Sequence, residues 1–534
     1  MKESSMSEAQ ARHDARVADR SASRWLMVCT GLAILGYGLA VHMPDLPYTT
    51  DELQYLLWSK DLAWGYFSKP PGIAFALSLW TVADPHAEHL RWFAQLCYAL
   101  SLVISFRLLR DEGLSTEYAL LGTLALGTMP FIGFAQWFFT TDALLLICWL
   151  LALAIAWRAW TATCFRRSAI WWALLGVVIA AGVLCKHFML FFWVGLGVHF
   201  ALLQDRTRWQ LYGLAICFLS FVWVLSPHIF WLVEHPGTTL KHLADLQSQG
   251  MHGSDLEAQG KDGLSVLRRL MQGAEFLGAQ WLGLGLGIVL LLRRAAALSG
   301  LQRMWLAHSV PVLLMFVVQA TISRAYANWA LPASFTLGLT MISYVLRAQG
   351  ESGPAVELRR RPDTVFYLSV WVAGNLLTSL VLAFAAPALK ASRPDLQMWV
   401  DRMDPFHRQR GWDALLVALT KLNKPAAIPW GVSDRDTAAR IAHRFGENQL
   451  VYRGTPGSKP NHYAIHYSQE GSDNTLGSRK PGAQCTWFLA RESQLTGSQG
   501  YEAIKRVAIA RLERQRLSGR SEAWLVWPEA CDKS

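Results

Sequence analysis

Apolar runs along the first two thirds of the chain restrict its possible folds more than any other feature. A membrane-spanning helix needs about 20 apolar residues. Eleven runs approach that length, at roughly 24–43, 89–107, 117–136, 140–157, 169–185, 187–203, 209–233, 274–292, 304–321, 328–346 and 364–386. Charged residues make up only 17% of the chain, whereas a soluble domain carries about 25%. The sequence therefore predicts a polytopic α-helical membrane protein with about eleven transmembrane helices.

The net charge of +11 does not indicate a nucleic-acid partner, because the basic residues lie mainly in short loops between apolar runs. Arginine and lysine concentrate in the short cytoplasmic loops of membrane proteins, and here they concentrate in every second loop. This bias places the N-terminal tail, residues 1–23, in the cytoplasm. An odd number of spans then places the first loop, 44–88, and the C-terminal domain outside. Since no small-residue cleavage site follows the first run, we expect that run to remain as an anchor.

The chain divides into the tail, a membrane module at 24–388, and a soluble domain at 389–534. The soluble domain is expected to be α/β, with strands at 425–431 and 449–453 around a helix at 434–445. A second helix is expected at 500–517, followed by a strand near Trp524–Trp527. Cys485 and Cys531 are candidates for a disulfide if this domain lies in an oxidising compartment. The other six cysteines fall in or beside apolar runs and suit core packing.

The first outer loop carries an unusual segment, DELQYLLWSKDLAWGYFSKPP, which begins at Asp51. Its apolar residues recur at helical spacing, which favours short amphipathic helices in the membrane interface. Asp51 and Glu52 follow two threonines, so one interpretation is a capped helix start with carboxylates in the first turn. The other interpretation is catalytic, because a sugar hydroxyl becomes a good nucleophile once a carboxylate accepts its proton.

Two further charged residues lie in or beside apolar runs, and each has a structural and a functional interpretation. Asp142 begins an apolar run, where an acid is costly; it either caps a helix with its threonine neighbours or belongs to an acid/base or cation-binding group. Lys69 precedes Pro70 and Pro71, which are expected to end the amphipathic segment. Its ammonium group either snorkels to the interface or binds a lipid-linked phosphate at headgroup level.

Two more outer turns are rich in cationic and polar side chains. Lys186 and His187 separate two apolar runs, and Arg324, Tyr326 and Asn328 lie at another turn. Each alone is typical of a helix-end anchor, but together with Lys69 they would form a cationic rim suited to a phosphate. Outer histidines and Glu88 are scattered without the spacing of a known metal site.

Six motifs in order resemble one family. They are DELQYLLWSKDLAWGYFSKPPGIAFAL, TTDALL, the Lys186 turn, IFWLVEHPGTTLKHL, AEFLGAQWLGL and SRAYANWALPA. The first resembles the first outer loop of the polyprenyl-phosphate-dependent membrane glycosyltransferases of the C type. The bacterial aminoarabinose transferases of lipid A and, more distantly, the protein O-mannosyltransferases belong to this group. The resemblance covers about the first 345 residues.

This resemblance implies an enzyme that moves a sugar from a polyprenyl phosphate to a lipid, glycan or protein of the cell envelope. Its implied location is the bacterial inner membrane, with the C-terminal domain in the periplasm. Asp51 would act as base or acceptor-orienting group, followed by Glu52, with Asp142 as the second acid. Lys69 would contact the lipid phosphate.

Lys186, Arg324 and Tyr326 map more loosely to further phosphate contacts. The family has members with and without a divalent cation, so a metal held by Glu52, Asp142 or Glu88 stays open. Two other classes also stay open: a flippase or transporter of lipid-linked sugars, and a non-catalytic binder of lipid phosphate. A transporter would favour internal repeats and broken helices at mid-membrane, and the opening motif does not recur in the second half.

Overall fold

The structure is a computed structural model of all 534 residues. The residues that it describes are 27–36, 38, 46–85, 89–203, 207–236, 262–284, 298–323, 325–347, 363–392, 400–401, 404, 406–452, 463, 486–495, 501–516 and 520–528. They form two compact units. The helical unit contains Met1–Met43, Lys69–Ile73 and Asp84–Leu380, and the α/β unit contains Pro44–Ser68, Ala74–Ala83 and Val381–Ser534.

The helical unit is built almost entirely of helices and their short connections. Its helices are α4 (Leu90–Asp111), α5 (Thr116–Gly127), α6 (Pro130–Ala135), α7 (Thr141–Thr161), α8 (Phe165–Cys185), η1 (His187–Phe191), α9 (Phe192–Leu202), α10 (Arg208–Glu234), α12 (Asp262–Leu284), α13 (Gly300–Ile322), η3 (Ala327–Ala330) and α14 (Leu331–Arg347). Helices α3 (Gly72–Ala83) and α15 (Asp363–Ser392) each run from one unit into the other.

Within the described ranges, seven helices are long and apolar enough to cross a membrane. They are Leu90–Asp111, Thr141–Thr161, Phe165–Cys185, Arg208–Glu234, Gly300–Ile322, Ala327–Leu346 and Leu368–Lys390. Each coincides with a predicted span, so the multi-pass membrane protein is confirmed in this coarser form. Two other predicted spans correspond to shorter apolar helices, Met27–Gly36 and His187–Leu202.

The predicted span at 117–136 is interrupted in the structure. Helix α5 ends at Gly127, and α6 begins at Pro130. Proline lacks the amide hydrogen that a continuous helix requires, but it is well suited to the first position of a new helix. The apolar run therefore forms two short helices. The predicted span at 274–292 begins inside α12, and its last residues, 285–292, lie outside the described part of the chain.

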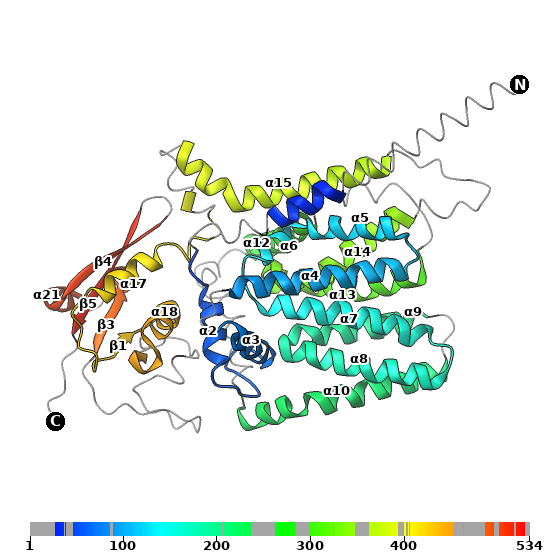
Figure 1. The fold of residues 1–534 in the computed structure, drawn as a ribbon, viewed down its shortest axis with the longest axis horizontal. Coiled ribbons are helices and arrows are strands. Elements are labelled where there is room, and N and C mark those ends of the chain that lie inside the picture. Colours follow the sequence, from blue (N-terminus) through cyan, green and yellow to red (C-terminus); the bar gives the residue numbers. More distant parts are fainter. Residues whose placement is uncertain are drawn as a thin grey trace, which may run out of the picture. The chain divides into compact units, whose positions relative to one another are not determined.

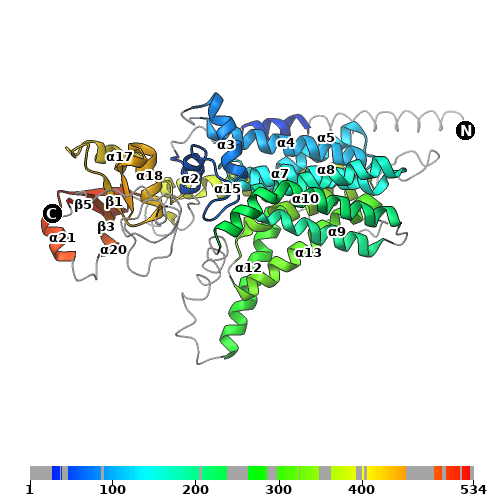
Figure 2. The same cartoon turned by 90° about the horizontal axis from the view of Figure 1, so that it is seen from below.

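Helices α4, α7, α8 and α10 lie side by side in that order (Figure 1), and each contacts the next. Helix α13 contacts α9, α12 and α14 in a second group of helices (Figure 2). Trp149 of α7 lies fully buried at the junction of these groups. Its indole nitrogen donates to Thr336 Oγ1 of α14 at 2.9 Å, and its ring contacts Phe188 and Phe192.

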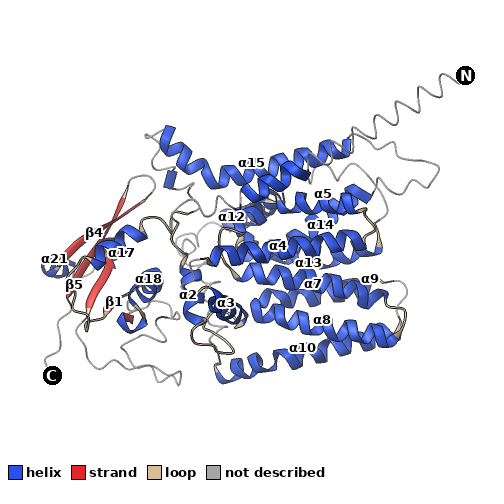
Figure 3. Ribbon diagram, in the orientation of Figure 1, coloured by secondary structure: helices blue, strands red, loops and turns tan. Residues whose placement is uncertain are grey.

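The α/β unit has a five-stranded mixed sheet (Figure 3). Its strands are β1 (Trp430–Val432), β2 (Leu450–Tyr452), β3 (Trp487–Arg491), β4 (Ala510–Gln515) and β5 (Ser521–Pro528), in the order β2-β1-β3-β5-β4. Strand β1 pairs in parallel with β2 and β3, whereas β5 pairs antiparallel with β3 and β4. The helices are α2 (Thr50–Trp58), α17 (Trp412–Thr420), α18 (Arg435–Phe445), η5 (Glu447–Gln449), α20 (Glu492–Leu495) and α21 (Tyr501–Val507).

The predicted helix at 434–445 is confirmed as α18, and the predicted strands overlap β1, β2 and β5. The predicted helix at 500–517 is wrong over its second half, because α21 ends at Val507 and β4 follows. Residues Ala510–Gln515 form a ladder with β5, with Leu512 opposite Trp524. Sheet pairing therefore outweighs the helix propensity of this charged stretch. Cys485 and Cys531 lie outside the described residues, so their disulfide stays a prediction.

Helix α2, from the segment predicted to form the first outer loop, packs into the core of the α/β unit. Leu53 is buried in one cluster with Trp412, Trp430, Ile441 and Trp524. This places Leu53 in one folded body with residues that lie 359 to 471 positions further along the chain.

A buried indole stabilises this core further. Trp412 is fully buried, and the guanidinium groups of Arg440 and Arg514 lie 4.5 and 4.6 Å from its ring centroid. Cation–π contacts of this kind contribute about 0.5–2 kcal/mol each.

His443, near the end of α18, should make the α/β unit sensitive to acid. Although the His443 side chain is exposed, partial desolvation lowers the pKa of its imidazole below its ordinary value, and the charges of Lys60, Arg440 and Arg444 lower this pKa further. The unfolded chain then binds a proton more readily than the folded one, so the free energy of unfolding falls as the pH drops below about 6.5. We expect His443→Gln to reduce this loss, measured as Tm at pH 7 and pH 5. Equal Tm changes in both proteins would contradict this expectation.

Candidate active site

A buried ion pair joins two helix ends in the helical unit. Lys186 Nζ lies 2.6 Å from Asp142 Oδ1, and their side chains are only 15% and 6% exposed. Asp142 occupies the first turn of α7, where Thr140 caps the helix, and Lys186 follows the last residue of α8. A carboxylate is favoured at a helix N-terminus and a cation at a C-terminus. Both helix dipoles therefore stabilise this pair.

Asp142 also accepts a hydrogen bond from a residue far along the chain. Asn328 Nδ2 donates to Asp142 Oδ2 at 3.3 Å. The turn that carries Asn328 is fixed by Gln280 of α12, whose amide nitrogen donates to Ala327 O at 2.9 Å. Gln280 Oε1 in turn accepts from the Ser334 hydroxyl at 2.5 Å. The motifs TTDALL, CKH, AEFLGAQWLGL and SRAYANWALP thus meet around one carboxylate.

The backbone after Cys185 leaves the α-helix at Lys186, which is extended with φ −158° and ψ 129°. The 3₁₀ helix η1 then follows, and Phe188 anchors it against Trp149, with ring centroids 5.6 Å apart. His187 Nε2 lies 3.2 Å from His228 Nε2 of α10. These contacts fix the turn that follows Lys186, and the ion pair with Asp142 holds its ammonium group.

The Lys69-Pro-Pro segment lies against the end of α8. An added Cβ on Gly72 would come within 2.6 Å of Leu184 O and 2.9 Å of Cys185 N. The backbone that follows Lys69 therefore touches the backbone that precedes Lys186. The expectation that Pro70 and Pro71 end an amphipathic helix is wrong, because α2 ends at Trp58 and the prolines precede α3 at Gly72.

This close approach allows a stability prediction. Gly72→Ala should lower the free energy of unfolding by about 1–3 kcal/mol, because the new methyl group meets backbone atoms that cannot yield easily. Gly197→Ala in α9 is the matched control, since nothing lies within 4 Å of its added Cβ. Thermal unfolding of the purified protein measures both variants, and equal Tm values would contradict the contact.

Asp51 belongs to the α/β unit, where it forms an ion pair with Arg435 at the start of α18. Arg435 Nε also donates to Gln54 Oε1 at 2.8 Å. The Asp51 side chain remains 47% exposed. Partial burial alone would lower the pKa of the Arg435 guanidinium, but the Asp51 carboxylate more than offsets this and the pKa lies above its ordinary value.

Glu52 has a structural position beside Asp51. The Thr49 hydroxyl accepts from Glu52 N at 3.1 Å, and Glu52 Oε2 accepts from Thr49 N at 2.7 Å. This reciprocal pair is a capping box, as the helix-start interpretation of the sequence predicted. Glu52 is fully buried, whereas Asp51 is open to solvent, so the two acids have different surroundings.

The remaining predicted residues are placed as follows. Tyr326 is 40% exposed, with its ring 5.5 Å from that of Trp329. Arg324 and Glu88 lie outside the described residues. Within the described ranges, no three His, Cys, Asp or Glu side chains are grouped to hold a metal ion.

Sequence reasoning did not single out Gln280, His228 or Arg435. The only available signal was that polar side chains interrupt apolar motifs at Gln280 and His228. Arg435 carried no signal, because its partner Asp51 is 384 positions away.

Comparison with known proteins shows which proteins this chain is similar to. Residues 68–231 match the model of the dolichyl-phosphate-mannose-protein mannosyltransferases. A lipid A galacturonosyltransferase, RgtD, of Rhizobium johnstonii is 29% identical over 347 residues, which covers 61% of this chain and 67% of the relative.

Two solved structures have a fold similar to that of this chain. ArnT from Cupriavidus metallidurans bound to undecaprenyl phosphate superposes with a TM-score of 0.61 at 14% identity, covering 94% of this chain and 98% of ArnT. ArnT in the apo state gives a TM-score of 0.59 at 12% identity, covering 95% and 98%. The resemblance inferred from the six motifs is confirmed by these matches, because the chain is similar to a mannosyltransferase family model and to a lipid A galacturonosyltransferase and has the fold of ArnT.

Proposed function

We propose that this protein transfers a sugar from an undecaprenyl-type phosphate to a lipid, glycan or protein of the bacterial cell envelope. The observation that carries the proposal is the arrangement around Asp142. There, Lys186 is held at a helix end, and the Lys69 segment packs against the same end. A lysine paired with a carboxylate, with the segment of a second lysine at the same helix end, suits a lipid-linked phosphate. Two similar proteins, a lipid A galacturonosyltransferase and an ArnT bound to undecaprenyl phosphate, support the same donor and acceptor classes.

The proposed reaction is an inverting displacement. The acceptor hydroxyl oxygen forms a bond to the anomeric carbon as the bond from that carbon to the phosphate oxygen breaks. The electron pair of the broken bond stays on the phosphate, and the hydroxyl proton passes to the Asp51 carboxylate. Lys186 and Lys69, with Arg324 and Tyr326 as further contacts, stabilise the charge on the departing phosphate.

Asp142 and Glu52 have supporting roles in this proposal. Asp142 holds the Lys186 ammonium group where the phosphate binds, and Glu52 fixes the start of α2 and so the position of Asp51. A divalent cation near Glu52, Asp142 or Glu88 is compatible with the proposal but is not required by it.

The proposed topology has eleven spans, with the N-terminus in the cytoplasm. Residues 44–88 and the domain at 389–534 then lie in the periplasm, and the transfer takes place at that face of the inner membrane. Arginine-rich short loops on one side support this orientation. Cysteine labelling of 44–88 and 389–534 in intact cells tests it, and labelling only after permeabilisation of the inner membrane would refute it.

Donor binding can be tested separately from turnover. Lys69→Met and Lys186→Met should each weaken binding of farnesyl phosphate to the purified protein at least tenfold, because each removes one charge-assisted contact. Lys60→Met is the control, since this exposed lysine lies outside the proposed phosphate site. Unchanged binding in both test variants would exclude the phosphate site.

Arg435 acts in this proposal as a positioning residue for Asp51. An exposed ion pair contributes only about 0–1 kcal/mol to stability, so Arg435→Gln should fold normally. Loss of the guanidinium removes a charge that favours the ionised carboxylate. The pH below which transfer declines should therefore rise in Arg435→Gln and return toward the wild-type value in Arg435→Lys. A purely structural role predicts a lower rate with an unchanged pH profile.

A further inference from the structure

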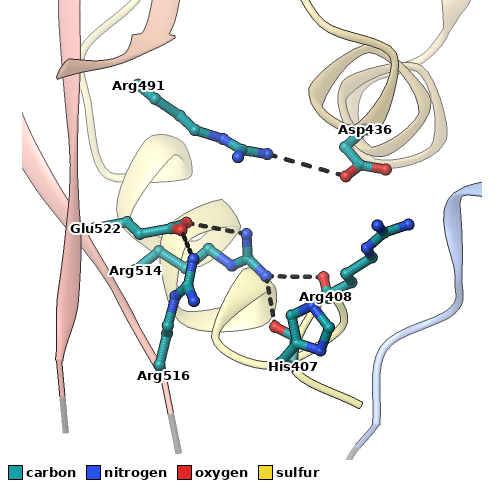
Figure 4. Close-up of a pocket in the computed structure, with 7 residues that line it drawn as sticks. All are labelled: His407, Arg408, Asp436, Arg491, Arg514, Arg516 and Glu522. Carbon is teal, nitrogen blue, oxygen red and sulfur yellow. Dashed lines mark hydrogen bonds and ion pairs between the residues drawn. The ribbon is translucent and has the colours of Figure 1, made fainter. Parts of the chain in front are cut away.

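A pocket in the α/β unit gathers more guanidinium groups than carboxylates. Its cavity of about 240 Å³ is lined by His407, Arg408, Asp436, Arg491, Arg514, Arg516 and Glu522. The four arginines come from the segment before α17, from strands β3 and β4 and from the residue that follows β4, and they face two carboxylates on α18 and β5 (Figure 4). The lining carries a formal excess of two positive charges.

One arginine is fully used in holding the pocket together. Arg514 is buried, and its guanidinium donates to the carbonyl oxygens of Arg410, His407 and Arg408 at 2.9, 3.1 and 2.7 Å. It also donates to Glu522 Oε2 at 3.2 Å. Burial alone would raise the pKa of Glu522, but Arg516 and Arg514 hold it below its ordinary value. The Glu522 carboxylate is therefore charged at neutral pH and shared by two arginines.

Two of the other lining arginines, Arg491 and Arg408, keep hydrogen-bonding capacity. Within the described part of the chain, Arg491 Nε is buried without a hydrogen-bond partner, and its contact with Asp436 is long, at 3.9 Å. The Arg408 guanidinium makes no hydrogen bond or ion pair with any described residue, and Figure 4 shows its side chain beside the same space. Arginine forks match the oxygens of a phosphate group in geometry as well as in charge.

We propose that this pocket binds a phosphate monoester carried by the acceptor. A phosphate monoester has a charge of about −1.5 to −2 at pH 7, which matches the excess on the lining. The small cavity suits a single phosphate group, with the rest of the acceptor outside it. The pocket also connects to the proposed base, because Asp436 accepts from the Thr50 hydroxyl next to Asp51. The assignment of the phosphate to the acceptor rests on the proposed function, whereas phosphate binding itself does not.

Calorimetric titration of the purified full-length protein with glucose 1-phosphate tests the pocket directly. Arg408→Gln and Arg491→Gln should each weaken binding at least tenfold. Arg506→Gln, which removes an exposed arginine of α21 outside the pocket, should bind like the wild type. Arg408 is exposed, so its variant should fold even if Arg491→Gln, which loses a contact with Trp524, does not. Wild-type affinity in Arg408→Gln would overturn the proposal.

Two further measurements identify the source of the phosphate and test the pocket independently of the proposed function. Glucose 1-phosphate should bind more tightly than inorganic phosphate, and equal affinities would overturn the assignment to an acceptor. Binding only to phosphatidic acid in nanodiscs would overturn it in favour of a bulk membrane phospholipid. Farnesyl phosphate is also a monoester, so its binding to the lysine site is measured with the pocket saturated by glucose 1-phosphate. Under that condition Lys186→Met should lose farnesyl phosphate, and without farnesyl phosphate Lys186→Met should keep glucose 1-phosphate whereas Arg408→Gln should lose it. Pocket binding without any sugar transfer would refute the proposed function and leave the pocket standing.

Discussion

Replacement of Asp51 by asparagine should lower the rate of sugar transfer by about 10²–10⁴-fold, the usual contribution of a general base. The amide keeps the shape of the side chain and can still accept a hydrogen bond from Arg435, but it cannot take up the hydroxyl proton. Asp51 is 47% exposed and the capping box belongs to Thr49 and Glu52, so the variant should fold like the wild type.

The measurement is transfer by purified protein in nanodiscs, with lipid-linked sugars and acceptors from an envelope extract. Asp61→Asn is the matched control, because it removes another exposed acid of the same loop and should retain full activity. Farnesyl phosphate binding should be unchanged in Asp51→Asn. Activity within a factor of two of wild type would exclude Asp51 as the base.

Replacement of Lys186 by methionine should affect both stability and transfer. Methionine leaves the buried Asp142 carboxylate without its countercharge, and such a loss costs about 3–5 kcal/mol. It also removes the ammonium group proposed to hold the phosphate. We therefore expect a large decrease in Tm together with loss of farnesyl phosphate binding and at least a 100-fold loss of transfer.

A double variant separates these two effects. Lys186→Met combined with Asp142→Asn removes the uncompensated charge, so Tm should return most of the way to the wild-type value. Transfer should stay low, because the phosphate contact is still missing. Recovery of transfer along with Tm would contradict the phosphate role and leave Lys186 only a structural one.

The sequence predicted the membrane helices well where hydropathy alone decides the outcome. Helix α8 ends at Cys185, and the break at Lys186 falls where two charged or polar residues separate two apolar runs. The same reasoning did not predict the break in the run at 117–136, where Pro130 begins a second helix. Hydropathy averages over such a run, whereas the helix is broken by the local loss of one amide hydrogen.

The α/β unit was less predictable, because its sheet depends on contacts distant in sequence. Ala510–Gln515 alternates inward Leu512 and Arg514 with exposed Arg511 and Glu513, a period of two that marks a strand. Its charge and length favoured a helix until the pairing with β5 was known.

In the candidate site, too, local features were predictable from the sequence and contacts between distant residues were not. Motif order correctly indicated which proteins the chain resembles, and the threonine and glutamate spacing correctly indicated the helix cap. The partners of the two acids were not predictable from local pattern. Lys186 meets Asp142 across 44 positions and Arg435 meets Asp51 across 384, distances over which spacing carries no information.

The most direct test of the central claim is the fate of the polyprenyl carrier. Nanodiscs containing the protein and an extract of lipid-linked sugars should release one free undecaprenyl phosphate for each sugar that appears on an acceptor, both measured by mass spectrometry. Asp51→Asn and Lys186→Met should release none above background. Intact lipid-linked sugar after incubation with active wild-type protein, or its movement across the bilayer without cleavage, would contradict the account.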